Sequence, residues 1–188
     1  MEYNPQRHNR RSIRVRGFDY SSEGGYFVTI CAYQKKCIFG KIGGEEMKLS
    51  MIGKIVKKYW LEIPRHFPNV ELDEFIVMPN HIHGVILLWG DEGDRVGARH
   101  AVPLPERYGK PVSGSLPTIV RSFKSAVTKG VNEIRRTPGG TLWQRGFYEH
   151  IIRDEDDLNR IRQYVSENVL KWLFDKENPE RIESDQRM

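Results

Sequence analysis

Residues 77–88 read VMPNHIHGVILL. Pro79 and Asn80 are typical of a tight turn, and apolar runs flank them on both sides. We therefore expect two strands, over residues 70–78 and 81–89. Strands joined by so short a turn are antiparallel neighbours, so this pair is expected inside a sheet.

The rest of the chain supplies further strands and helices around this pair. The periods of the apolar residues, together with capping and turn residues, predict a strand over 26–33, a small hairpin over 38–50, a helix over 51–66, a helix over 117–136, a strand over 147–153 and a last helix over 155–172. The order of the main elements is strand, helix, strand, strand, helix, strand, helix. It predicts an α+β fold of the ferredoxin-like split βαβ type, an antiparallel sheet with helices on one face and a separate C-terminal helix.

Length and composition fit one globular domain with short additions at its ends. The 188 residues are 38% hydrophobic and 29% charged, which excludes an intrinsically disordered chain. We expect an N-terminal arm over 1–20, a domain over 21–174 and a polar tail over 175–188. Residues 90–114, rich in Gly, Pro and charge, predict a loop.

Several features argue for a cytoplasmic protein that does not enter a membrane. The longest apolar runs are too short to span a bilayer, and the basic N-terminus lacks the apolar stretch of a signal peptide. Cys31 and Cys37 are too few for a disulfide framework.

Positive charge is clustered, and the net charge is +5. Arg10, Arg11 and Arg14 lie in the arm, while Arg121 and Lys124 lie in the 117–136 helix. Clustered cations suit contacts with nucleic-acid phosphates, although a solvated basic surface would look the same.

His81 and His83 are the first candidates for chemistry. Side chains two apart in a strand leave the same face of the sheet, so both imidazoles project together while Ile82 enters the opposite layer. Two imidazoles form part of a divalent-metal site. Two ordinary polar residues at the start of a strand remain the alternative.

Tyr164 and Asn168 are four residues apart on the last helix, and therefore on one face of it. A phenol with a pKa of about 10 is a weak nucleophile at neutral pH. A nearby metal ion would compensate by polarising the phosphate that the phenol attacks. Tyr164 also borders the apolar stripe of the helix, so a buried core tyrosine is the alternative.

Residues 143–150 read WQRGFYEH. Aromatic side chains can stack on unpaired bases, so Trp143, Gln144 and Arg145 are candidate DNA contacts, with core packing of Trp143 left open. Tyr148 is a rival nucleophile, and His150 is more consistent with a structural role.

Taken together, HNRRSIRVRGFDY, GGYFVTIC, VMPNHIHGVILL, SFKSAVTK and LWQRGFYEHIIRDEDDLNRIRQYVSENVLKW resemble the REP-associated tyrosine transposases. These are HUH nucleases related to the single-tyrosine insertion-sequence transposases. The resemblance implies a ferredoxin-like domain whose C-terminal helix is catalytic. It implies that His81 and His83 bind Mg²⁺ or Mn²⁺ and that Tyr164 is the nucleophile. Asn168 stands where the insertion-sequence relatives have a glutamine ligand.

The resemblance further implies a single-stranded DNA substrate that carries a hairpin. The implied product is a 5′-phosphotyrosine with a free 3′-hydroxyl. The active form is implied to be a monomer, or a homodimer that exchanges the tyrosine helix.

Two other functions fit parts of the sequence. A ferredoxin-like sheet with aromatic residues is also the plan of non-catalytic modules that bind single-stranded nucleic acid. A hydrolytic metalloenzyme acting on a small substrate would need a further ligand beside the histidines, for which Asp73 and Glu74 are candidates.

Overall fold

The fold is known from a computed structural model, which describes residues 18–90, 112–175 and 177–180. Arg10, Arg11, Arg14 and nearly all of the expected 90–114 loop lie outside these residues. The described elements are β1 (Gly24–Cys31), η1 (Tyr33–Lys35), β2 (Gly40–Gly43), β3 (Glu46–Leu49), α1 (Met51–Leu61), α2 (Ile63–His66), β4 (Val70–Val77), β5 (His81–Leu88), α3 (Leu116–Arg135), β6 (Tyr148–Ile152), α4 (Glu155–Glu167) and η3 (Trp172–Phe174). None of the helices within these ranges has the length and apolar character needed to cross a membrane.

Four strands form one antiparallel sheet in the order β4-β5-β1-β6, and β2 pairs with β3 in a separate hairpin. The predicted turn between β4 and β5 is confirmed, because the Met78 N–H donates to the His81 carbonyl over 2.8 Å. With β1 and β5 in the middle, the two strand–helix–strand units interleave, so the predicted ferredoxin-like plan is confirmed.

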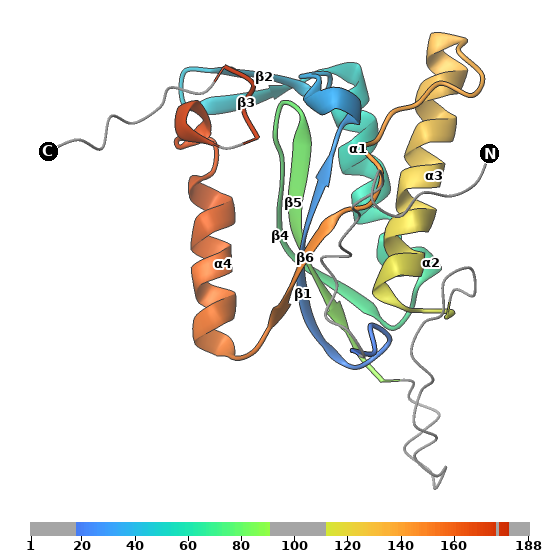
Figure 1. Cartoon of the computed structure of the whole chain (residues 1–188), viewed down its shortest axis with the longest axis vertical. Helices are drawn as coiled ribbons and strands as arrows, with labels where there is room; N and C mark the ends of the chain where they lie inside the picture. The colour runs from blue at the N-terminus through green and yellow to red at the C-terminus, as the bar shows by residue number, and fades with distance from the viewer. Residues whose placement is uncertain (1–17, 91–111, 176, 181–188) are drawn as a thin grey trace, which may run out of the picture.

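Helices cover both faces of the sheet, with α1 and α3 on one face and α4 on the other (Figure 1). Ile82 and Ile86 of β5 belong to the large core that includes α1 and α3. Val85 instead packs with Ile161 and Val165 of α4. The predicted arrangement, helices together on one face and a separate C-terminal helix, is thus confirmed. Every second side chain of β5 points toward α4.

The helix expected over 51–66 is divided in two. Ser50 caps α1 as predicted, since its Oγ accepts a hydrogen bond of 3.1 Å from the Gly53 N–H. The helix stops at Leu61 because Pro64, in the first turn of α2, has no N–H to donate to the Trp60 carbonyl.

Gly84 lies where α1 packs against β5. A Cβ atom at Gly84 would lie 2.3 Å from Cζ2 of Trp60, whose buried indole is itself stacked on Phe75. We expect Gly84→Ala to lower the free energy of unfolding by about 1–3 kcal/mol through overpacking, measured by urea denaturation. Gly43→Ala is the control, because a Cβ there would meet its nearest atom at 3.7 Å. Equal losses from both changes would contradict this packing.

Candidate active site

His81 and His83 face each other beneath α4. Their Nε2 atoms lie 2.9 Å apart, and the exposed fractions of the two residues are only 0% and 2%. Both side chains leave the α4 face of the sheet, as the strand period predicts. The imidazoles are therefore a buried pair at the start of β5.

Each imidazole is also held through its other ring nitrogen. His83 Nδ1 lies 2.9 Å from Thr29 Oγ1, and His81 Nδ1 lies 2.8 Å from Asn80 Oδ1. The Asn80 amide nitrogen donates to the carbonyls of Lys35 and Glu177, which turns the amide oxygen toward His81. This network assigns the proton of neutral His81 to Nδ1 and leaves a lone pair on Nε2, as in metal-binding histidines.

The Tyr164 hydroxyl reaches this pair. It lies 3.2 Å from His83 Nε2, and the ring packs edge-on against Phe27. Tyr164 is 39% exposed, so the alternative of a core tyrosine is wrong. Burial of the hydroxyl end, then the charge of Asp175, raise the pKa of Tyr164, while the neighbouring Asn168 side chain opposes this shift.

Two polar contacts, together with apolar packing, hold α4 against the sheet. Arg162 forms an ion pair with Asp73 of β4, its Nε donating to Oδ1 over 3.0 Å. In the first turn of α4, Asp157 accepts a 2.8 Å hydrogen bond from His150 of β6, which lowers the pKa of Asp157 to about 2. His150 is thus structural, as expected, and Tyr164 is positioned by contacts within its own chain.

Asn168 ends α4, which stops at Glu167 rather than near residue 172. The Asn168 N–H donates to the Val165 carbonyl, a tighter turn than that of an α-helix. Its side chain is buried, and its Oδ1 has no hydrogen-bond partner among the described residues. A buried amide oxygen without a partner is costly, so this atom is available to a cation.

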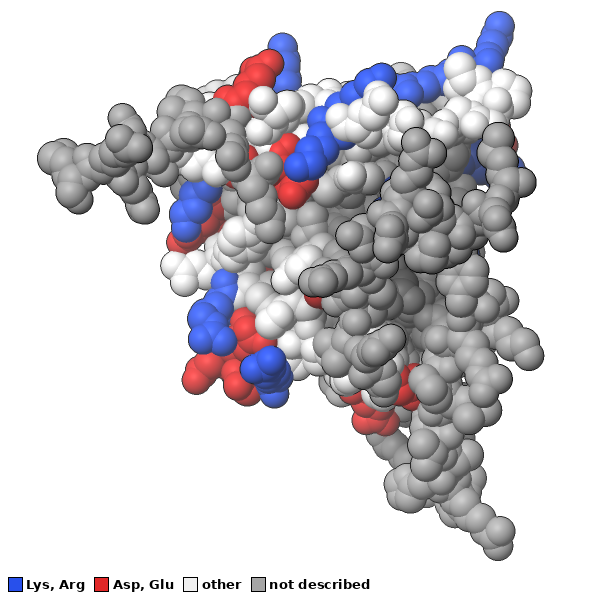
Figure 2. Space-filling view, in the orientation of Figure 1, with Lys and Arg blue, Asp and Glu red and all other residues white. Residues whose placement is uncertain are grey.

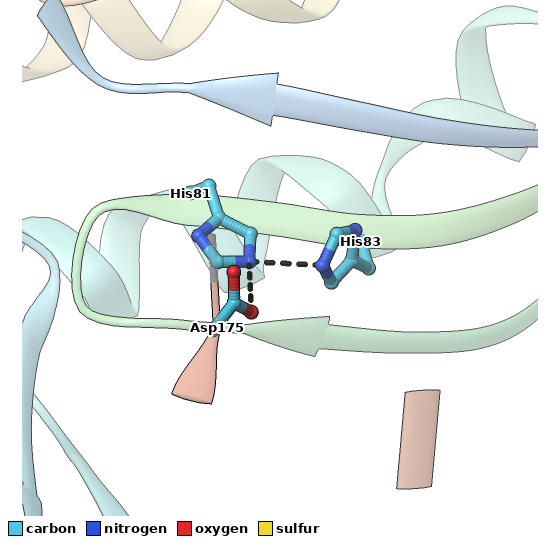
Figure 3. A group of neighbouring side chains, drawn as sticks. All are labelled: His81, His83 and Asp175. Carbon is cyan, nitrogen blue, oxygen red and sulfur yellow. Dashed lines mark hydrogen bonds and ion pairs between the residues drawn. The ribbon is translucent and has the colours of Figure 1, made fainter. Parts of the chain in front are cut away.

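Asp175 completes the cluster, and no local sequence pattern marks it as a ligand. Its carboxylate is 6% exposed and lies 3.9 Å from His81 Nε2, pointing at the histidine pair from the segment after η3 (Figure 3). We expected residue 175 to open a polar tail, but the described residues there pack against the body. Glu177 forms an ion pair of 3.1 Å with Lys35, and Asn178 is buried.

The donor set fits a divalent cation. One ligand atom each from His81, His83 and Asp175 lies within 4.8 Å of the others. Imidazole nitrogen and carboxylate oxygen are ligands of divalent transition-metal ions, and the Asn168 oxygen is a candidate fourth donor. Asp73, a candidate ligand in the sequence analysis, is instead paired with Arg162.

Some of the candidate DNA contacts are exposed, and others are buried or hydrogen-bonded within the protein. Arg121, Gln144 and Arg145 are exposed and stay predictions. Trp143 is a correction: it is 6% exposed and lies between Phe39 and Phe123, so its indole has no face for a base.

Lys124 is the second correction. Its ammonium donates to the carbonyls of Gln144 and Gly146, over 2.7 and 2.9 Å, and burial lowers its pKa to about 8. It therefore holds the loop before β6 instead of standing free for a phosphate.

Comparison with known proteins places this site in a family. A Haemophilus influenzae protein of uncharacterised function is 40% identical over 179 residues, covering 93% of this chain and 96% of that protein, and the two belong to one family. A second protein of that organism, whose name places it among the REP-associated tyrosine transposases, is 30% identical over 106 residues. That match covers 56% of this chain and 52% of the relative, so the chain spans about half of it. No protein-family model matches the sequence.

The fold has a match among solved structures. A solved REP-associated tyrosine transposase bound to a REP hairpin superposes with a TM-score of 0.55 at 16% identity, covering 87% of this chain and 74% of that one. The chain therefore has the fold of this transposase. In this fold, the residues that the sequence resemblance singled out, His81, His83 and Tyr164, contact one another on the α4 face of the sheet.

Proposed function

We propose that this transposase-like protein is a metal-dependent endonuclease and strand transferase acting on single-stranded DNA, with Tyr164 as its nucleophile. One observation carries the proposal. A partly exposed phenol lies 3.2 Å from one of two imidazoles that face each other in a buried cluster. A nucleophile and metal ligands in one pocket are what phosphoryl transfer to a side chain requires.

His81, His83 and Asp175 would hold Mg²⁺ or Mn²⁺. Asn168, whose side chain neighbours Tyr164 and whose Oδ1 has no partner among the described residues, is the proposed further ligand. The ion would supply Lewis-acid polarisation of the phosphate and stabilise the charge that develops on it. Thr29 and Asn80 keep the imidazoles oriented for this task through the hydrogen bonds to their Nδ1 atoms.

The resemblance to the REP-associated tyrosine transposases implies the chemistry that we propose for Tyr164. Its oxygen forms a bond to phosphorus as the bond from phosphorus to the 3′ oxygen breaks, and a net proton passes from the phenol to the departing oxygen. The products are a 5′-phosphotyrosine and a free 3′-hydroxyl. Since the ester is kept on the enzyme, attack by another 3′-hydroxyl can rejoin strands without ATP.

Charge and similarity support DNA carrying a hairpin as the substrate. The related solved structure holds a REP hairpin. Basic side chains run along the upper edge of the molecule toward the end of α3, and acidic ones stand beside them at the β2–β3 hairpin end (Figure 2). The turn that leads into His81 lies at this end of the sheet (Figure 1). Exposed Arg121, Gln144 and Arg145 are proposed contacts, as are Arg10, Arg11 and Arg14 outside the described residues.

A non-catalytic nucleic-acid-binding module is the competing proposal, and one assay separates the two. A labelled hairpin oligonucleotide with a single-stranded extension is incubated with the protein and Mn²⁺. A labelled species that keeps its slow migration in SDS supports the enzyme. A shift seen only under native conditions supports the module.

Asp175→Asn tests the third ligand. Because this change removes one negative charge from the cluster, we expect Mn²⁺ affinity in calorimetry to fall by at least about tenfold, the smaller loss seen for changes around metal ligands. Asp156→Asn, on the exposed first turn of α4, is the control and should leave affinity unchanged. Equal affinity for both variants would remove Asp175 from the proposed site.

A further inference from the structure

Tyr148 opens the edge strand β6 and shares a row of the sheet with the active site. Its register partner on β1 is Thr29, and the partner of Thr29 on β5 is His83. Directly paired residues project from the same face, so Tyr148 lies on the face of the histidine pair. Two strand spacings, roughly 10 Å, separate its backbone from that of His83.

The α4 helix is joined to the edge of the sheet opposite β6. Arg162 joins α4 to Asp73 of β4, the strand at the opposite edge of the sheet from β6. The Tyr148 residue is 43% exposed, close to the 39% of Tyr164. Two partly open tyrosines thus lie on the same face, one beside the histidines and one two strands away.

Hydrogen bonds hold the backbone of the segment before Tyr148, although the side chains of Gln144 and Arg145 are exposed. Lys124 donates to the carbonyls of Gln144 and Gly146, and the Gln144 N–H donates 2.8 Å to the carbonyl of Cys31, the register partner of His81. Gly146 has a φ of 77°, which favours glycine and sets the turn into β6. A pre-ordered platform loses little entropy when it binds a ligand.

We propose that Tyr148 is a stacking platform for an unpaired base of the DNA strand whose phosphate lies at Tyr164. This rests on the proposed function for the identity of the strand. An exposed aromatic ring offers a face to any base, and stacking of this kind tolerates different sequences. The alternative role of Tyr148 as the nucleophile is disfavoured by its distance from the histidines. Exposed Arg145 adds a positive charge beside the platform.

The test separates base stacking from phosphate attraction. Fluorescence anisotropy compares binding of an oligodeoxyadenylate with binding of an abasic strand of equal length, both in the Tyr164→Phe background, where no cleavage interferes. We expect Tyr148→Ala to weaken binding of the oligodeoxyadenylate by about tenfold, within the range for one base–aromatic stack. Binding of the abasic strand should not change. Tyr148→Phe keeps the ring and should behave like the parent.

Trp89→Ala is the control, because Trp89 is 55% exposed but follows the far end of β5. The inference would be overturned if Tyr148→Ala weakened binding of the oligodeoxyadenylate and of the abasic strand equally, or weakened binding of neither. Because the assay needs no cleavage, its result does not depend on which residue is the nucleophile. If the protein forms an SDS-stable product but Tyr148→Ala shows no base-dependent loss of binding, the role of Tyr148 is wrong and the proposed function stands.

Discussion

Replacing Tyr164 by phenylalanine is expected to eliminate the SDS-stable protein–DNA product while leaving DNA binding nearly unchanged. The variant lacks only the oxygen that would form the phosphotyrosine bond. Its ring can keep the edge contact with Phe27, whose centroid lies 5.9 Å away, so α4 should stay docked. The measurement is denaturing electrophoresis of a labelled hairpin oligonucleotide incubated with Mn²⁺, alongside a native binding assay.

Two controls sharpen this result. Tyr148→Phe should still form the product, since Tyr148 is proposed to supply a ring and not a nucleophile. Mixing the Tyr164→Phe and His83→Ala variants should not restore activity, because Tyr164 meets His83 within one chain. Product formed by Tyr164→Phe itself would disprove its role as nucleophile, and restoration by mixing would indicate exchange of α4 between two chains.

His83→Ala is expected to reduce metal-dependent cleavage by at least about a hundredfold. Changes to groups that merely support metal ligands cost about ten- to a hundredfold, and His83 is itself a proposed ligand that also lies beside the attacking oxygen. Cleavage rates across a Mn²⁺ titration measure the loss. The variant should also bind Mn²⁺ more weakly in calorimetry.

His150→Ala is the matched control for His83→Ala. Both histidines lie on strands of the same sheet, but His150 bonds to Asp157 at the start of α4. Its loss should lower stability more than it changes the cleavage rate of the folded fraction. Comparable cleavage losses in both variants, at equal folded fractions, would contradict a specific metal role for His83.

Local patterns were enough to predict most of the fold and the centre of the site. The alternation in residues 81–88 places His81 and His83 on one face and Ile82 on the other, and the Pro79–Asn80 turn sets the pairing of β4 with β5. Helical spacing orients Tyr164 and Asn168 together. These features depend on neighbours within a few residues, so the sequence alone contains them.

The remaining features depend on contacts between distant segments. Asp175 reaches His81 only because the chain turns back after α4, and no local pattern marks that return. Trp143 and Lys124 were predicted as DNA contacts because the residue type alone does not tell whether an aromatic or basic side chain is exposed or buried. Both features depend on the packing of α3 against the loop before β6. This packing buries the Trp143 indole and brings backbone carbonyls to the Lys124 ammonium.

The most direct test of a shared metal and nucleophile pocket is anomalous diffraction from crystals soaked in Mn²⁺. We expect a manganese peak within coordination distance of Nε2 of both His81 and His83, bordered by the Asp175 carboxylate and the Tyr164 oxygen. A manganese peak elsewhere, with none at the histidine pair, would contradict a shared site. So would a manganese ion at the histidine pair with Tyr164 turned away from it in the DNA complex.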